Sequence, residues 1–367
     1  MTAPEDRRRR PGQGGTWDHG DMSRPSPPRR RRRPRGKPTL PDLMAVLHAS
    51  FGDRLHAAGL AVEMRIIQGG RPVDPSAVTL RKAFPRARRR IAVWVHGLGV
   101  TEGVWSFRGR SRTSYGAMLE RDAGFTPVFL RYNTGRSIQE NGAAADALLE
   151  RLEASWPVRP SEIALFGYSM GGLVVRSALQ QGIARSAPWV RLVRHTVHLG
   201  VPHLGSPLER AGRVGTSLLK SLPNPWTRLV GAVADLRSVG VKDLAGGDLV
   251  PDGTWVPLPT EGMHHAIIGT LHRDPHHVLS WLLGDGVVPV ASARARRYRG
   301  AEVFPAERVT IVGGIGHLGL PRSARVYPAI LGALTGRRRP AHPPAAQGGR
   351  RASTLSGTGR RGSVNRR

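Results

Sequence analysis

The chain of 367 residues carries a formal net charge of +30, is 39% hydrophobic and contains no cysteine. This length provides ample core for one large domain or two small ones. The missing cysteines exclude disulfides, thiolate zinc sites and cysteine nucleophiles. No apolar run approaches the roughly 20 residues of a membrane-spanning helix. The arginines near the N-terminus are not followed by the apolar segment of a secretion signal, so we expect a cytoplasmic protein.

The positive charge is concentrated at the two ends of the chain. Residues 1–40 hold 12 Lys and Arg against 4 acidic residues, and residues 336–367 hold 9 Arg and no acidic residue. Both segments are rich in Arg, Pro and Gly and poor in aliphatic side chains, so we expect them to be disordered. An anionic membrane surface is the partner that these tails favour. Nucleic acid is disfavoured, because no aromatic residues for base stacking lie among the arginines. Translation from Met22 or Met44 would remove the N-terminal arginine run.

Between the tails, residues 41–335 read as an α/β domain. The predicted elements are a helix over 40–60, a hairpin over 61–73, a strand over 91–95, a helix over 115–123, a strand over 126–130, a helix over 137–156, a strand over 163–166, a helix over 172–183, strands over 193–199, 265–271 and 308–312, and a helix over 323–334. Such alternation predicts a mostly parallel, doubly wound sheet. The alternation breaks between about 208 and 260, where we expect a helical cap or lid.

The segment Gly167-Tyr168-Ser169-Met170-Gly171 lies where the predicted 163–166 strand passes into a helix. It matches the nucleophile elbow, a tight turn that raises a serine hydroxyl above the end of a sheet. Glycine suits positions 167 and 171, because a side chain there would collide with the crossing strand and helix. The alternative interpretation is a glycine-rich helix start with Ser169 as its N-cap.

Two downstream loops supply a carboxylate and an imidazole. Asp285 lies between two glycines after the 265–271 strand, and His317 follows the 308–312 strand. Nucleophile, acid and base in this chain order form one of the known serine triads. We therefore predict that His317 takes the proton of Ser169 and that Asp285 holds the imidazole in the required tautomer.

Each of these two positions has a rival. Asp274 lies nearer the end of its strand, but Asp274-Pro275 has the composition of an ordinary turn. A group of histidines near that strand is richer than His317 alone; it comprises His264, His265, His272, His276 and His277. Their spacing matches no firm metal-ligand motif and carboxylates are sparse around them, so we assign them to strand flanks and loops.

Two backbone N–H groups are predicted to stabilise the oxyanion that forms when an acyl carbonyl is attacked. One belongs to Met170, the residue after the nucleophile, and the other to Leu98, in the turn after the 91–95 strand. His96 and Gly97 precede Leu98 and are expected to shape that turn. This chemistry requires no metal or organic cofactor.

Taken together, these motifs resemble the α/β-hydrolases of the bacterial lipase and GPI inositol-deacylase-like group. The resemblance covers about residues 85–335 and is carried by His96-Gly97-Leu98-Gly99, Gly167 to Gly172, Asp285 to Pro289, Gly316-His317-Leu318 and the Gly-x-Pro-His-x-Gly-Ser run at Gly200 to Ser206. It implies an α/β-hydrolase fold and hydrolysis of lipid-like carboxylic esters beneath a mobile cap. We expect the chain to differ from secreted lipases, because it has no cysteine for a disulfide and its N-terminal segment does not read as a signal peptide.

The sequence therefore predicts a serine hydrolase of the lipase or esterase kind, which cleaves lipid-like acyl esters through an acyl-enzyme. One alternative is an acyltransferase that uses the same acyl-enzyme. The other is a polybasic surface-binding protein in which the hydrolase fold is idle.

Overall fold

The computed structural model describes residues 63–107, 113–205, 239, 243–244, 257–259, 262–295 and 303–336. Several predictions concern residues outside this set: the N-terminal tail over 1–40, the helix over 40–60, most of the cap over 208–260, and all but the first residue of the C-terminal tail over 336–367. Among the described residues, no helix combines the length and the apolar character that crossing a bilayer requires.

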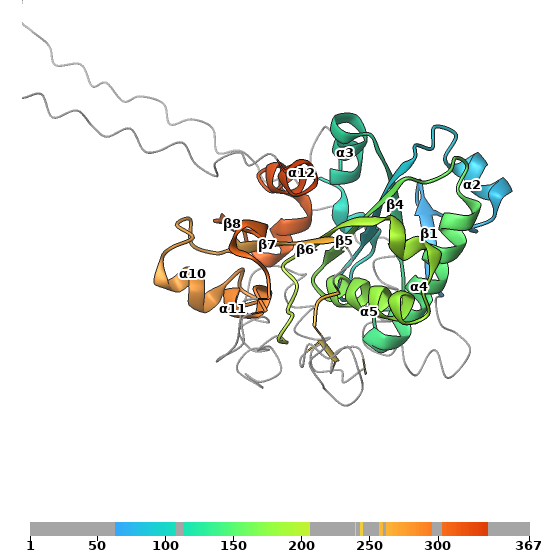
Figure 1. Cartoon of the computed structure of the whole chain (residues 1–367). Helices are drawn as coiled ribbons and strands as arrows, with labels where there is room; N and C mark the ends of the chain where they lie inside the picture. The colour runs from blue at the N-terminus through green and yellow to red at the C-terminus, as the bar shows by residue number, and fades with distance from the viewer. Residues whose placement is uncertain are drawn as a thin grey trace, which may run out of the picture. The chain divides into compact units, whose positions relative to one another are not determined.

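The described strands form one sheet in the order β2-β1-β4-β3-β5-β6-β7-β8 (Figure 1). The strands are β1 (Arg65–Gln68), β2 (Arg71–Val73), β3 (Arg90–Val95), β4 (Phe125–Arg131), β5 (Glu162–Tyr168), β6 (Val193–Leu199), β7 (Met263–Thr270) and β8 (Val309–Gly313). Strands β4, β3, β5, β6, β7 and β8 are mutually parallel. Strand β1 pairs antiparallel with both β2 and β4. The mostly parallel sheet predicted from the sequence is therefore confirmed.

The described helices are α2 (Ala77–Ala83), α3 (Tyr115–Ala123), α4 (Ile138–Ser155), α5 (Met170–Ala184), α10 (Val278–Leu283), α11 (Val290–Ala293) and α12 (Tyr327–Thr335). Helix α3 has its predicted bounds, and α4 starts after Ser137, which forms a capping box with Glu140. The predicted closing helix begins at Tyr327, not at residue 323, with Pro328 in its first turn. Helices α2, α10 and α11 were not predicted, because they are short and lack a clear apolar period.

The two faces of the sheet bury different apolar clusters, because successive strand residues point to opposite sides. Val93 and Leu165 lie in the cluster that includes side chains of α4 and α5. Trp94 and Phe166 lie in the other cluster, which includes side chains of α3 and α12, and their rings stack with centroids 3.9 Å apart. Figure 1 shows α3 and α12 on one side of the sheet and α4 and α5 on the other. Helices thus cover both faces, as in a doubly wound fold.

Candidate active site

Ser169 lies between the end of β5 and the start of α5, at a strained turn. Its φ is 53° and its ψ is −128°, a region that non-glycine residues rarely adopt. The turn is held by the bond from the Ser169 N–H to the Leu199 carbonyl (3.0 Å) and by the bond from the Gly172 N–H to the Ser169 carbonyl (2.9 Å). The hydroxyl makes no capping bond to α5. The alternative role of Ser169 as a side-chain N-cap is therefore not what the structure shows.

The glycines around Ser169 leave no space for a side chain. A Cβ atom on Gly167 would lie 2.3 Å from the Cα of Gly172, and a Cβ on Gly171 would lie 2.3 Å from the carbonyl oxygen of His96. Both neighbours are backbone atoms, so they could not move aside without shifting a strand or a helix. The crossing predicted from the sequence is thus present, and it fixes where the Ser169 hydroxyl points.

The structure brings the side chains of Ser169, His317 and Asp285 together. The Nε2 atom of His317 lies 2.9 Å from the Ser169 Oγ, and its Nδ1 atom lies 2.7 Å from Oδ2 of Asp285. The second carboxylate oxygen of Asp285 accepts the N–H groups of Val287 (3.0 Å) and Val288 (2.8 Å). All three side chains are buried. In this geometry the carboxylate accepts the Nδ1 proton, which leaves Nε2 free to accept the serine proton.

Two residues that the sequence did not indicate hold this triad in place. Tyr168 donates its hydroxyl to the carbonyl of His317 (3.1 Å), and its ring lies 5.0 Å from the imidazole. Gly200, with φ +56°, approaches so closely that a Cβ atom would lie 3.0 Å from Oδ2 of Asp285 and 3.3 Å from Nδ1 of His317. Burial, together with the charge of Asp285, raises the pKa of Tyr168 and keeps the phenol neutral.

The turn after β3 lies directly against Ser169. A Cβ atom on Gly97 would lie 3.0 Å from the Cβ of Ser169. Met170 is the first residue of α5, so its N–H has no partner inside the helix. No hydrogen bond between described residues uses the N–H of Leu98 or of Met170. Neither N–H group is therefore occupied by another described residue.

His96 is buried and makes its contacts with the backbone and an aromatic ring. Its Nδ1 atom lies 2.9 Å from the carbonyl of Gly97, and its ring stacks on Tyr132 with centroids 4.5 Å apart. Tyr132 in turn donates its hydroxyl to the His96 carbonyl (2.8 Å). Burial lowers the pKa of His96 to about 4, so the side chain stays neutral. These contacts suit a residue that shapes the turn before Leu98.

The rival residues lie apart from the triad. Asp274 is exposed, and its carboxylate accepts the N–H of His276 (2.8 Å) within its own turn. The histidines divide between separate contacts: His264 lies 3.0 Å from His198, and the rings of His272 and His277 stack. Within the part of the chain that the structure describes, no group of three or more His, Asp or Glu side chains suits a metal ion.

A buried arginine–histidine pair supports the loop after β6. The Nδ1 atom of His203 accepts a hydrogen bond from Nη1 of Arg176 (3.0 Å), and both side chains are fully buried. Burial lowers the pKa of Arg176 to about 9 and holds the pKa of His203 well below its usual value. His203 belongs to the run that carries the resemblance to lipases, and this bond ties that run, Gly200 included, to α5. The sequence marked the run but not its buried partner.

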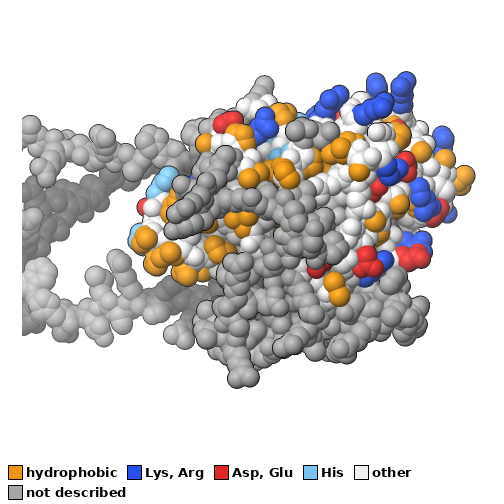
Figure 2. All heavy atoms as spheres, turned by 60° about the horizontal axis from the view of Figure 1, so that its bottom comes forward, with side chains coloured by type: hydrophobic (Ala, Val, Ile, Leu, Met, Phe, Trp, Pro, Cys, Tyr) orange, Lys and Arg blue, Asp and Glu red, His pale blue; other side chains and the backbone are white. Residues whose placement is uncertain are grey.

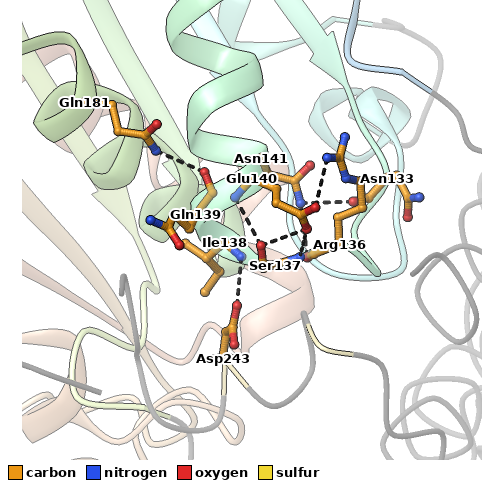
Figure 3. Close-up of polar contacts among 9 residues, drawn as sticks. All are labelled: Asn133, Arg136, Ser137, Ile138, Gln139, Glu140, Asn141, Gln181 and Asp243. Atoms are coloured by element: carbon orange, nitrogen blue, oxygen red, sulfur yellow. Dashed lines mark hydrogen bonds and ion pairs between the residues drawn. The ribbon is translucent and has the colours of Figure 1, made fainter. Parts of the chain in front are cut away.

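An apolar cluster lies next to Ser169 on the side of α4 and α5. Its members are Leu98, Ile138, Met170, Leu173, Val201 and Leu244. Leu244 comes from the region that we predicted to be a cap. The adjacent Asp243 accepts the N–H of Ile138 at the start of α4 (2.9 Å), beside the Ser137–Glu140 capping box (Figure 3). A carboxylate at a helix N-terminus also interacts favourably with the helix dipole. Asp243 and Leu244 thus attach this part of the predicted cap region to the start of α4 and to the apolar cluster.

At the amino ends of the parallel strands lies a cleft of about 560 Å³. Its lining includes Arg90, Glu162, Val193 and Met263, the first residues of β3, β5, β6 and β7, as well as Arg308. In parallel strands these residues lie at the end opposite to the nucleophile turn. The cleft therefore does not belong to the triad.

A parallel sheet with a serine elbow after β5, an acid after β7 and a histidine after β8 defines the α/β-hydrolase fold. No protein-family model matches the chain, and no curated protein matches it. Among solved structures, the mature lipase BlEst2 of Bacillus licheniformis is similar, with 20% identity, a TM-score of 0.44 and coverage of 66% of this chain and 90% of that one. The metagenomic carboxylesterase EstE1 is similar too, with 16% identity, a TM-score of 0.40 and coverage of 81% and 98%. The fold assignment rests on strand order and the elbow rather than on these scores.

Proposed function

We propose that this protein is a serine ester hydrolase in which Ser169 is the nucleophile, His317 the general base and Asp285 the residue that orients the base. The observation that carries this proposal is the continuous chain of short contacts from Asp285 through His317 to Ser169, at 2.7 and 2.9 Å. The strained backbone of Ser169 supports it as well, because strain of this kind clusters at functional sites.

The reaction follows from the positions of these groups. The Ser169 oxygen attacks the acyl carbonyl while His317 takes its proton, and Asp285 stabilises the imidazolium that forms. The N–H groups of Leu98 and Met170 would receive the oxyanion. His317 then gives the proton to the departing alcohol, which leaves an acyl-enzyme. Water, deprotonated by the same imidazole, attacks the acyl-enzyme and releases the carboxylic acid.

The apolar cluster beside Ser169 supports an aliphatic acyl group as the part of the substrate that is recognised. The partly exposed Leu98 belongs to this cluster, together with the buried Leu173 and Val201 behind it. Similar structures are named a lipase and a carboxylesterase, which agrees with a lipid-like ester. We propose short- to medium-chain aliphatic esters as the first substrates to test.

A fluorophosphonate probe tests the nucleophile, and a series of p-nitrophenyl esters of rising chain length tests the acyl preference. We expect the wild type to be labelled and to release p-nitrophenol, and Ser169→Ala to do neither. The exposed Ser161→Ala is the matched control and should behave as wild type. Equal labelling of Ser169→Ala would overturn the proposal. Added glycerol or hexanol separates hydrolysis from acyl transfer, since a transferase would form the new ester faster than the free acid.

A further inference from the structure

Helix α10 has an apolar face that points outward. Four of its six residues are largely exposed aliphatic side chains: Val278 (63%), Leu279 (45%), Leu282 (66%) and Leu283 (52%). Ser280, which has no exposed surface, faces the body of the protein and donates its hydroxyl to the carbonyl of Asp274 (2.6 Å). The helix thus buries a polar residue and exposes apolar ones, the reverse of a helix that covers a core.

Leu271 extends this apolar face toward the triad. It is 52% exposed, and its N–H donates to the carbonyl of Gly284 at the end of α10 (2.8 Å). Its side chain lies beside the glycines next to the acid and the base: a Cβ on Gly286 or on Gly316 would lie 3.2 Å from a Leu271 methyl group. Leu271 and the four α10 residues form the α10 patch, which adjoins the loops that hold Asp285 and His317.

Charged side chains and histidines lie next to the α10 patch. Arg273 and three histidines, His272, His276 and His277, lie on the connection between β7 and α10. The acid of this connection, Asp274, has its carboxylate bonded to the N–H of His276 (2.8 Å). The guanidinium of Arg294 lies over the ring of Trp281, 5.5 Å from its centroid. Figure 2 shows hydrophobic side chains beside histidines on the side where Figure 1 places α10.

We propose that the α10 patch is the surface through which this protein docks on an anionic lipid bilayer, with its aliphatic side chains among the acyl chains. Exposed leucines beside the exposed Arg273, on a chain with a net charge of +30, fit the boundary between anionic headgroups and acyl chains. A second copy of the chain fits less well, because a helix about 9 Å long presents far less than the roughly 800 Å² that each partner of a stable dimer buries. The docked surface would hold the triad loops next to the lipid.

The absence of native cysteine allows one labelled position at a time. Leu282→Cys carries an environment-sensitive NBD label, and Val78→Cys, 80% exposed on α2, is the matched control. With vesicles of phosphatidylglycerol and phosphatidylcholine, we expect a blue shift and a several-fold rise in emission at position 282 and neither at position 78. Vesicles of phosphatidylcholine alone should give a weaker response. A label at position 282 that is already blue-shifted without vesicles would overturn the proposal, since another segment would then cover the patch.

Co-sedimentation of the unlabelled full chain provides the second measurement. At 0.5 M NaCl, where the contribution of the basic tails is screened, Leu279→Ser/Leu282→Ser should bind anionic vesicles at least about tenfold more weakly than wild type. Val78→Ser should bind as wild type, and both variants should keep normal turnover of p-nitrophenyl acetate, which shows that they are folded. The proposal would be overturned if the double variant bound anionic vesicles as tightly as wild type does. It would also be overturned if the double variant lost self-association and kept its vesicle binding. Ser169→Ala should bind normally, so the result does not depend on the proposed hydrolysis.

Discussion

The two edges of the parallel sheet carry opposite kinds of polar groups. At the carboxyl edge, the imidazole of His317 lies buried between the Asp285 carboxylate and the Ser169 hydroxyl. At the amino edge, Arg90 pairs with Glu162 at 2.7 Å beside an open cleft of about 560 Å³. At the carboxyl edge, hydrogen bonds hold the Asp285 carboxylate and the His317 imidazole in fixed positions. At the amino edge, the opposite charges of Arg90 and Glu162 offset each other close to solvent.

This difference reflects how each edge is built. Loops after β5, β7 and β8 converge on one point, where glycines such as Gly171 and Gly200 let backbones approach closely. At the amino edge, long side chains reach across the ends of the strands and remain partly exposed, as for Arg90 at 38%. Substitutions at the carboxyl edge should therefore change the reaction, and those at the amino edge should change stability only slightly.

The largest effect is expected for His317→Gln, which removes the base that links Asp285 to Ser169. The amide could still hydrogen-bond the hydroxyl but could not take its proton. We expect kcat for a p-nitrophenyl ester to fall by roughly 10⁵- to 10⁶-fold, with little change in the melting temperature. A loss of less than about 100-fold would mean that another residue acts as the base.

A smaller loss is expected for Asp285→Asn, which keeps the shape of the acid but favours the wrong imidazole tautomer. A decrease in kcat of about 10⁴-fold is expected. Asp274→Asn, in the exposed turn before α10, is the control and should retain wild-type kcat. The reverse result would make Asp274 the acid.

Gly200→Ala tests how much of the triad geometry depends on close packing. The new methyl group would press against Oδ2 of Asp285 and Nδ1 of His317, and φ at this position is +56°. We expect kcat to drop by about 100-fold while KM changes little, because displacement by about 1 Å is enough for such a loss. Gly69→Ala, at a positive φ in the β1–β2 turn but with open space around it, is the control and should not affect kcat.

Acid should weaken the folded state through histidines that are fully or partly buried. The pKa values of His96 and His265 are lowered to about 4, mainly by burial, whereas an exposed histidine titrates near 6.5. The unfolded chain therefore binds more protons between these values. The free energy of unfolding should fall as pH drops from about 6.5 to about 4, by roughly 1.4 kcal/mol per pH unit for each such histidine. Urea titrations should show a shallower pH dependence for His265→Asn than for wild type.

The smallest effect is expected for Glu162→Gln at the amino edge. The change breaks the partly exposed pair with Arg90, whose contribution is about 1 kcal/mol or less. Thermal unfolding should shift by a few degrees at most, and kcat should stay within about twofold of wild type. A large loss of activity would show that the two edges are coupled through β5.

The sequence allowed us to predict that Ser169, Asp285 and His317 lie together, because each follows the end of a strand in a recognisable order. It did not indicate Tyr168 as a partner of His317, since the two residues are separated by 149 positions and meet only once the sheet has formed. The partner of His203 on α5 was missed for the same reason. Helix α10 was missed because its inward residue is Ser280 and its leucines face outward, which gives no apolar face toward a core. Patterns within one element were therefore predictable, whereas contacts between distant elements were not.

The backbone conformation of Ser169 lowers the thermal stability of this protein. A φ of 53° with a ψ of −128° is tolerated by glycine far better than by serine. Ser169→Gly should therefore produce an inert protein that is more heat-resistant than the active one, by about 1 kcal/mol or more. Under the proposed function, selection for stability could not use this gain, because the same position carries the nucleophilic hydroxyl.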